Sequence, residues 1–293
     1  MAFYSFCSVG VKSEILPCSY LPFLIRADES LKKADITIEK RRTLHFAKKT
    51  IKVCDLSYMA IGKCELSDNS YRWLYEAKNG MCSFSIDPEY TNVEYCYLEK
   101  IDYFENIKVE ELFTPYFQIV FECKLLQRGV SVLHAACIEL NGYAYAFTGP
   151  SGIGKSTRAQ KWCDLLSAQF ISGDRPAINI KEGTAYGVPW DGKEAIYRNV
   201  SYPLAAIIKV RRSEKTCIIE LTETEKLQLL YEQSFLPLWD TSLVANSLFF
   251  LKHLINTIPI FELCCDITDE STYISYKLVT DKINNMKGDS YEN

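Results

Sequence analysis

The stretch Phe147–Thr157, which reads FTGPSGIGKST, constrains what this chain can fold into more than any other. It carries the spacing Gly149-x-x-x-x-Gly154-Lys155-Ser156, the pattern of a phosphate-binding loop between a β-strand and an α-helix. Its glycines let backbone N–H groups face phosphate oxygens, its lysine reaches the terminal phosphates, and its serine hydroxyl can coordinate Mg²⁺. Because an apolar run precedes the loop and helical spacing follows it, we predict a nucleotide site rather than a glycine-rich turn that binds nothing. The residues expected to contact the nucleotide are Gly149, Ser151, Gly152, Ile153, Gly154, Lys155, Ser156 and Thr157.

The sequence just before this loop predicts how its strand is paired. Ala136–Leu140 and Tyr143–Phe147 are strand-like runs joined by Asn141-Gly142, the preferred dipeptide of a two-residue hairpin turn. The strand that leads into the loop should therefore pair antiparallel with its predecessor. All-parallel cores of the Ras or adenylate kinase type join consecutive strands by helical crossovers instead. We therefore predict an α/β protein, mixed α+β, with a mixed and largely antiparallel sheet.

Composition excludes several classes of protein. The 293 residues are 48% hydrophobic, enough for one large or two medium domains, and 33 basic against 37 acidic residues give a formal charge of −4. That charge provides no general attraction for nucleic acid or an anionic membrane. Met1–Val11 is apolar but has neither a basic segment before it nor a small-residue cleavage site, and no apolar stretch approaches the length of a membrane span. We expect a cytoplasmic protein that binds neither nucleic acid nor membrane.

The twelve cysteines are spread singly along the chain, apart from the adjacent pair Cys264-Cys265. Without C-x-x-C spacing or a signal peptide, reduced and mostly buried thiols are favoured over a disulfide or metal framework. The three histidines, His45, His134 and His253, are too few and too scattered to form a zinc site.

Residues 1–107 predict a small β-rich domain with a potential role in substrate recognition. Aromatic residues such as Tyr71, Trp73, Tyr75 and Tyr90 are more typical of a packed sheet face than of a ligand-stacking surface. The basic cluster Lys40–Arg42 with Lys48-Lys49 fits a solvated edge better than a docking site. The strands expected here are Tyr4–Val11, Thr37–Glu39, Thr43–Phe46, Thr50–Val53, Tyr71–Glu76, Cys82–Ile86 and Val93–Leu98.

Residues 108–293 form the second predicted domain, which begins near a helical pattern at Val109–Arg128. Within it, Phe170–Asp174 reads as a short strand that ends in an acid, and Asp174 lies 19 residues after Lys155. A carboxylate at that strand end can face Mg²⁺ or an attacking hydroxyl beside the phosphates. It could instead cap a turn before Pro176, but its place one helix after the loop favours a role in the site.

A glycine-rich, charged loop follows at Gly187–Glu194. Its Lys193 could stabilise charge on a transferred phosphate, and Arg198 follows closely enough to join the site. Equally, this could be a surface turn in which Trp190 is a buried anchor. The remaining expected elements are a hairpin of Ala177–Ile180 with Ala185–Val188, strands at Val130–His134, Leu204–Val210, Thr216–Leu221 and Ile258–Ile267, and helices at Glu223–Phe235, Ser242–Asn256 and Asp269–Val279.

Together these motifs resemble the kinase domain of HPr kinase/phosphorylase and its relatives, which share a core with ATP-dependent phosphoenolpyruvate carboxykinase. The resemblance spans about residues 108–280. It is carried by His134, 15 residues before Gly149, the Asn141-Gly142 hairpin, the SGIGKS loop, the acid in Ser172-Gly173-Asp174-Arg175, and the Gly-x-Pro-Trp-x-Gly-Lys run at Gly187–Lys193.

The resemblance implies a P-loop kinase that holds ATP phosphates on Gly149–Thr157 and Mg²⁺ on Ser156 and Asp174, with His134 close to the phosphate acceptor. One departure matters, because HPr kinases carry two adjacent acids where this chain has Gly173 before Asp174. Either Asp174 fills both roles, or His134 or Asp191 helps as base; His134 could equally be a structural residue. HPr kinases form hexamers, so the resemblance allows a homo-oligomer.

The arginine-rich loop associated with phosphorylase activity is not found in this sequence, and the divergence does not favour HPr itself as substrate. Some relatives phosphorylate precursor peptides of natural products. We therefore expect a kinase that phosphorylates a serine or threonine hydroxyl of a peptide or small protein, with Lys155 and either Lys193 or Arg198 offsetting phosphate charge. Two alternatives remain open: a kinase of a small molecule such as an amino acid or sugar, and a regulatory protein that binds ATP without catalysis.

Overall fold

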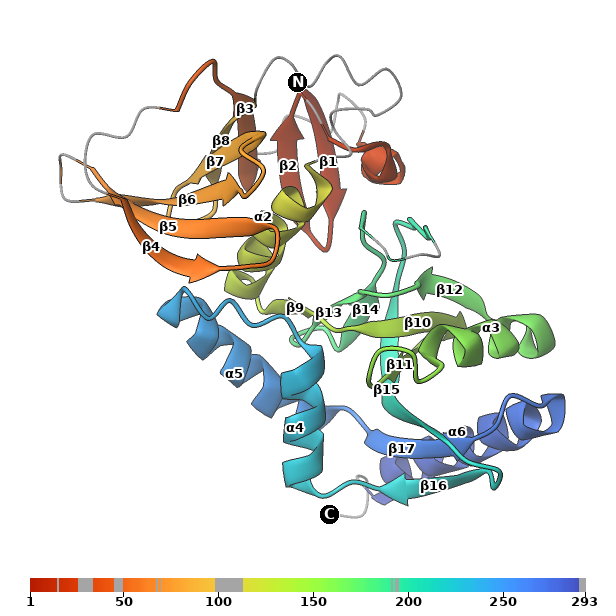
Figure 1. The fold of residues 1–293 in the computed structure, drawn as a ribbon. Helices are drawn as coiled ribbons and strands as arrows, with labels where there is room; N and C mark the ends of the chain where they lie inside the picture. Colours follow the sequence, from red (N-terminus) through yellow and green to blue (C-terminus); the bar gives the residue numbers. More distant parts are fainter. Residues whose placement is uncertain are drawn as a thin grey trace. The chain divides into compact units, whose positions relative to one another are not determined.

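The computed structural model describes residues 1–14, 16–25, 34–44, 50–66, 68, 70–97, 113–190, 192 and 195–289. The chain is a mixed α and β protein in two compact units (Figure 1). The first unit is Met1–Arg128 with Pro237–Val244, and the second is Gly129–Leu236 with Ala245–Asn293. The boundary expected after residue 107 lies outside the described residues. Within the described part of the chain, no helix has the length and apolar character needed to cross a membrane.

The first unit contains an eight-stranded sheet in the order β1-β2-β3-β8-β7-β6-β5-β4. β4 to β8 form an antiparallel meander, whereas β3 pairs parallel with both β2 and β8. The strands are β1 Ala2–Phe6, β2 Val9–Ser13, β3 Ile36–Lys40, β4 Thr50–Asp55, β5 Met59–Glu65, β6 Tyr71–Ala77, β7 Cys82–Ile86 and β8 Asn92–Tyr97, with a 3₁₀ helix η1 Cys18–Phe23 and the helix α2 Thr114–Gln127.

The strand expected at Tyr4–Val11 is instead the hairpin of β1 and β2. Its turn residues Cys7 and Ser8 both have positive φ, 50° and 61°, the conformation of a two-residue hairpin turn. Asn or Gly usually marks that conformation, so the sequence carries no ordinary signal for this turn. β5 was not expected either. In the expected strand Thr43–Phe46, Thr43 and Leu44 do not form a strand, and the other two positions lie outside the described residues.

Aromatic side chains fill the core of the first unit. Phe84 on β7 stacks on Tyr116 of α2, with ring centroids 5.2 Å apart, and meets Phe117 edge to face at 5.4 Å. Trp73, Tyr75 and Tyr90 are buried, at most 4% exposed. Their expected role in sheet packing is confirmed, because their rings pack within the unit rather than facing solvent.

The second unit is built on a nine-stranded sheet in which the long strand β15 takes part in two sets of pairings. Its first residues pair antiparallel with β14, and its later residues pair parallel with β11 on one side and β17 on the other. The strands are β9 Val130–Val132, β10 Ala135–Leu140, β11 Tyr143–Thr148, β12 Gln169–Ser172, β13 Ala177–Asn179, β14 Thr184–Tyr186, β15 Ser201–Arg212, β16 Cys217–Glu220 and β17 Ile260–Cys265. The helices are α3 Lys155–Leu166, α4 Glu223–Gln233, α5 Thr241–Thr257 and α6 Asp269–Asp289, and the first residues of α5, up to Val244, belong to the first unit.

The predicted hairpin before the loop is confirmed. β10 and β11 pair antiparallel over Ala135–Leu140 and Tyr143–Thr148, and Asn141 and Gly142 have φ of 54° and 81°. The hairpin of β13 and β14 is confirmed as well. The last helix is longer than the expected Asp269–Val279, because α6 continues through its polar residues to Asp289.

Alternating side chains along the strands fill a core on each face of this sheet. On one face Tyr145 and Phe147 pack with Trp162 of α3 and Val279 of α6. On the other face Ala144, Ala146 and Ile207 pack with apolar residues of α4 and α5. Both faces of β11 are therefore covered by helices. A site near β11 must then be formed at the ends of β11 and its neighbouring strands rather than on a face of the sheet.

Candidate active site

The glycine-rich loop lies between the end of β11 and the start of α3, as the sequence predicts. Gly152 and Gly154 have φ of 77° and 114°, and a Cβ added to either would meet nothing within 4 Å. Glycine is therefore required there by backbone conformation rather than by lack of space. The loop opens at the N-terminus of α3, where the first backbone N–H groups have no partner within the helix. This combination is what an anionic group needs in order to bind.

Lys155 is folded back over this loop. Its Nζ donates to the carbonyl oxygens of Gly149 at 3.0 Å and Pro150 at 3.3 Å, and the residue is only 7% exposed. The cation therefore lies against the backbone of the loop.

The sheet topology brings His134 and Asp174 to the same edge as the loop. β11, β12, β15 and β17 all run in one direction, so their carboxyl ends meet, while β10 runs oppositely and begins there. His134 directly precedes β10, and Asp174 follows β12. The His134 Nε2–H donates to Asp174 Oδ1 at 3.0 Å, with both side chains about 30% exposed.

Backbone contacts hold this histidine–aspartate pair in place. The His134 N–H donates to the carbonyl oxygen of Gln233 at 2.7 Å, and the Thr148 hydroxyl donates to the His134 carbonyl oxygen at 2.8 Å. The Ala135 N–H donates to the Asp174 carbonyl oxygen at 2.8 Å. The pair therefore has little freedom to separate.

Asp174 is held in its ionised form. The hydrogen bond from His134 lowers the pKa of Asp174, and the charges of His134, Arg175 and Lys155 add to this, whereas partial burial acts in the opposite direction. The contribution from Lys155 shows that the loop lysine and this carboxylate share one electrostatic environment. At neutral pH the site presents a carboxylate beside the loop.

The loop after β14 reaches the same carboxylate. A Cβ added to Gly192 would lie 3.0 Å from the Cβ of Asp174, so this glycine packs directly against the aspartate. Trp190, 1% exposed, is a buried anchor. The expected burial of Trp190 is therefore confirmed, whereas the role expected of Lys193 stays a prediction. Asp191 and Lys193 lie outside the described residues.

Arg198 is not brought to this edge. Its guanidinium donates to the carbonyl oxygen of Phe170 and, at 3.1 Å, to Oε1 of Gln169. These residues begin β12, whereas Asp174 follows its end, so Arg198 lies toward the opposite end of the strand from the loop.

Ser156 and Asp174 are the oxygen donors that could hold Mg²⁺. Within the described part of the chain no group hydrogen-bonds the Ser156 hydroxyl, and no cluster of three or more His, Cys, Asp or Glu side chains could hold a metal by itself. Mg²⁺ ordinarily binds through one or two protein oxygens together with substrate phosphates and water. The donor set therefore fits Mg²⁺ that arrives with a nucleotide rather than a resident metal.

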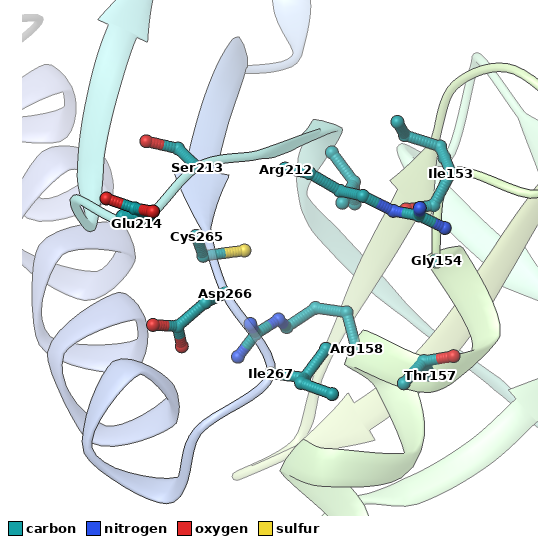
Figure 2. A pocket seen from close by; sticks show the side chains of 11 residues that line it. Ile153, Gly154, Thr157, Arg158, Arg212, Ser213, Glu214, Cys265, Asp266 and Ile267 are labelled. Atoms are coloured by element: carbon teal, nitrogen blue, oxygen red, sulfur yellow. The ribbon is translucent and has the colours of Figure 1, made fainter.

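A pocket of about 680 Å³ adjoins the loop (Figure 2). In the sheet order, β15 and β17 lie on one side of β11, and β12, which precedes Asp174, lies on the other. Its volume lies in the range of small-molecule sites. The walls come from the loop and the start of α3 on one side and from the ends of β15 and β17 on the other. The lining residues are Ile153, Gly154, Thr157, Arg158, Val210, Arg212, Ser213, Glu214, Cys265, Asp266 and Ile267.

The polar residues of this pocket are mostly engaged with the protein. Arg158, 3% exposed, donates from Nη1 to the Thr272 hydroxyl at 3.0 Å, and Asp266 accepts from the backbone and hydroxyl of Thr268 at 2.8 and 2.6 Å. Ile267, by contrast, is 66% exposed. Sequence reasoning missed these residues, although Ile267 ends a predicted strand and Arg212 lies two residues beyond the end of another, and ligands bind at the carboxyl ends of strands in α/β sheets.

Compared with known proteins, the chain matches no family model and no curated protein sequence.

Proposed function

We propose that this chain is an ATP- and Mg²⁺-dependent kinase with a P-loop core of the HPr kinase and phosphoenolpyruvate carboxykinase type, which phosphorylates a serine or threonine hydroxyl of a peptide or small protein. The observation that carries the proposal is the 3.0 Å hydrogen bond between His134 and an ionised Asp174 at the edge that bears the glycine-rich loop. A protein that binds a nucleotide without transferring phosphate needs only the loop. A hydroxyl kinase also needs a carboxylate where the acceptor approaches the phosphates.

In this proposal the loop N–H groups and Lys155 bind the phosphates. Lys155 exchanges its bonds to the Gly149 and Pro150 carbonyl oxygens for phosphate oxygens. Ser156 and Asp174 hold Mg²⁺, which offsets negative charge on the phosphates when bound. The nucleoside occupies the pocket beside the loop, where the exposed Ile267 offers an apolar contact to a base.

The acceptor hydroxyl lies against Asp174 and His134. Its oxygen forms a bond to the terminal phosphorus while the bridging P–O bond breaks, and ADP leaves with that electron pair. The hydroxyl proton passes to the Asp174 carboxylate. Because the pKa of Asp174 is lowered, this carboxylate is a weak base and accepts the proton late, so orientation and charge stabilisation supply most of the rate. His134 keeps the carboxylate oriented.

The peptide acceptor rests on the resemblance to kinases that modify precursor peptides. Gly173, in place of a second acid, favours a competing function, an ATP-binding regulatory protein that transfers nothing. A small-molecule kinase would use the same loop and carboxylate with a different acceptor.

Intact-mass spectrometry of candidate acceptors separates these functions. The purified chain is incubated with ATP, Mg²⁺ and small peptides, beginning with any encoded beside it, and then with free amino acids and sugars. Lys155→Ala and Asp174→Asn should each lower phosphoryl transfer by about 10²–10⁴-fold. Asp164→Asn, which changes an exposed carboxylate on α3, is the matched control and should retain activity.

Asp174→Asn should still bind ADP, because the loop is intact in that variant. Transfer to metabolites but to no peptide would support the small-molecule kinase. ADP binding by the wild type without transfer to any acceptor would refute both kinases and leave the regulatory function.

A further inference from the structure

Arg212, the last residue of β15, contacts the backbone of the glycine-rich loop. Its Nη2 donates to the carbonyl oxygen of Gly152 at 2.6 Å and its Nε donates to that of Ile153 at 3.1 Å. Figure 2 shows the side chain extending from β15 across one wall of the pocket toward Ile153. One guanidinium therefore holds two successive peptide groups of the loop.

Holding these two carbonyl groups also fixes the direction of the N–H group in each of the same two peptide planes. A trans peptide is planar, and its C=O and N–H bonds point in opposite directions. The Gly152 carbonyl shares a plane with the Ile153 N–H, and the Ile153 carbonyl shares one with the Gly154 N–H. With both carbonyl oxygens turned to Arg212, both N–H bonds point away from that side chain. Phosphate binding by such a loop requires its N–H groups to be held in fixed directions.

The loop has few other contacts that could fix these peptide planes. No atom lies within 4 Å of a Cβ added at Gly152 or Gly154, so side-chain packing does not restrain them. The Ile153 N–H donates to the Pro150 carbonyl oxygen at a long 3.3 Å. Lys155 holds the loop carbonyl oxygens of Gly149 and Pro150, and it must release them to bind phosphate.

We infer that Arg212 is a positioning residue that holds the loop in its phosphate-binding conformation, acting through two backbone carbonyl groups rather than through the ligand. The inference rests on the proposed nucleotide function. It assigns Arg212 to the polyphosphate half of the ligand, although its side chain lines the pocket proposed for the nucleoside. An arginine is needed because its planar fork presents two N–H groups in fixed directions, whereas a lysine presents one compact charge.

The neighbouring Arg211 provides a matched control. Its side chain is 61% exposed and pairs with Glu262 at 3.1 Å, and among the described residues it makes no hydrogen bond to the loop. Replacing either arginine by methionine removes the same charge from the same strand end and keeps a similar length. A difference between the two variants therefore reports the loop contacts rather than the net charge.

The test is titration of wild type, Arg212→Met, Arg212→Lys and Arg211→Met with pyrophosphate, ADP and adenosine in the presence of Mg²⁺. Arg212→Met should weaken pyrophosphate and ADP binding equally, each by about tenfold, because two hydrogen bonds from a charged donor are lost. Adenosine binding should not change. Arg212→Lys should restore only a small part of the loss, and Arg211→Met should bind all ligands as the wild type does.

Wild-type pyrophosphate affinity in Arg212→Met would overturn the inference. Full recovery in Arg212→Lys would also overturn it, because charge acting on the phosphates would then suffice. A loss for ADP and adenosine but not for pyrophosphate would assign Arg212 to the nucleoside instead. If the wild type binds neither ADP nor pyrophosphate, the proposed function itself fails, and this inference fails with it.

Discussion

The two sheets of this protein differ in where they keep their charged groups. In the first unit the ion pairs lie on the surface, where Arg41, whose side chain is 47% exposed, pairs with Glu39 and Glu94. The buried charged side chains of this unit include Glu122 and Lys124, which lie on the helix α2. In the second unit, charged groups collect at one sheet edge, with Lys155 7% and Arg158 3% exposed. Burying charge costs stability unless it is compensated. Lys124 is compensated by the Glu89 carbonyl oxygen and the Thr91 hydroxyl, whereas Lys155 lies at the glycine-rich loop and acts on the pKa of Asp174, an arrangement more typical of a functional site.

Strand direction explains this difference. From β4 to β8 the first sheet is an antiparallel meander, so successive strand ends alternate between its two edges. In the second sheet β11, β15 and β17 are parallel neighbours and deliver their carboxyl ends to one edge. Such convergence is what creates ligand sites in α/β proteins. Substitutions in the first sheet should therefore change stability, and those at the edge of the second should change binding and transfer.

Among the substitutions that test this difference between the two units, Phe84→Ala is expected to change stability most. Phe84 is fully buried between β7 and α2, so its loss should lower the free energy of unfolding of the first unit by about 3–5 kcal/mol. The measurement is urea denaturation, with pyrophosphate titration on the folded protein. Ile51→Ala on the edge strand β4, where the side chain is 49% exposed, is the control and should change stability by less than about 0.5 kcal/mol. A large loss of pyrophosphate affinity in folded Phe84→Ala would break the distinction between the units.

A smaller effect, on stability and on phosphoryl transfer together, is expected from Gly187→Ala. The added Cβ would lie 2.0 Å from the Arg198 carbonyl oxygen, so the backbone must shift, at a cost of about 1–3 kcal/mol. Because this backbone leads to Gly192, which packs against Asp174, phosphoryl transfer should fall as well. Thermal unfolding and transfer rates measure the two effects. Gly80→Ala is the control. It places an alanine at a positive φ of 70°, and its Cβ would meet no atom within 4 Å, so it should lower stability without changing phosphoryl transfer. Unchanged transfer in Gly187→Ala would contradict a role for this loop at Asp174.

Features with local signals could be predicted from the sequence. Asn141-Gly142 predicts the β10–β11 hairpin because both residues tolerate positive φ. The helix α4 begins where expected because Thr222 and Glu225 form a reciprocal capping box at its start. In the hairpin of β1 and β2, Cys7 and Ser8 adopt positive φ without being residues that favour it, so packing of the flanking strands decides that turn.

The site was only partly predictable because pairing between distant strands assembles it. The loop and Asp174 lie in recognisable local patterns, but the contacts of Arg212 depend on β15 lying beside β11, more than 50 residues earlier in the chain. No local pattern specifies that neighbour. Arg198 illustrates the converse: it closely follows the Gly187 loop in sequence, yet its guanidinium contacts the start of β12 instead of the carboxylate after its end.

The smallest effect is the pH dependence that Asp174 should give to stability. Its pKa is lowered in the folded protein, first by the His134 hydrogen bond, so the ionised carboxylate stabilises the fold at pH above the ordinary carboxyl pKa of about 4. That stability is lost as the pH falls through the lowered folded pKa. The free energy of unfolding of the wild type should thus exceed that of Asp174→Asn at pH 7, and the difference should narrow in acid, as measured by urea denaturation from pH 7 to pH 3. In a His134→Ala background the difference at pH 7 should shrink, because the largest contribution is already gone. A difference that stays constant with pH would show that Asp174 acts by packing, as residues of the first unit do, and that charge at this edge contributes nothing to stability.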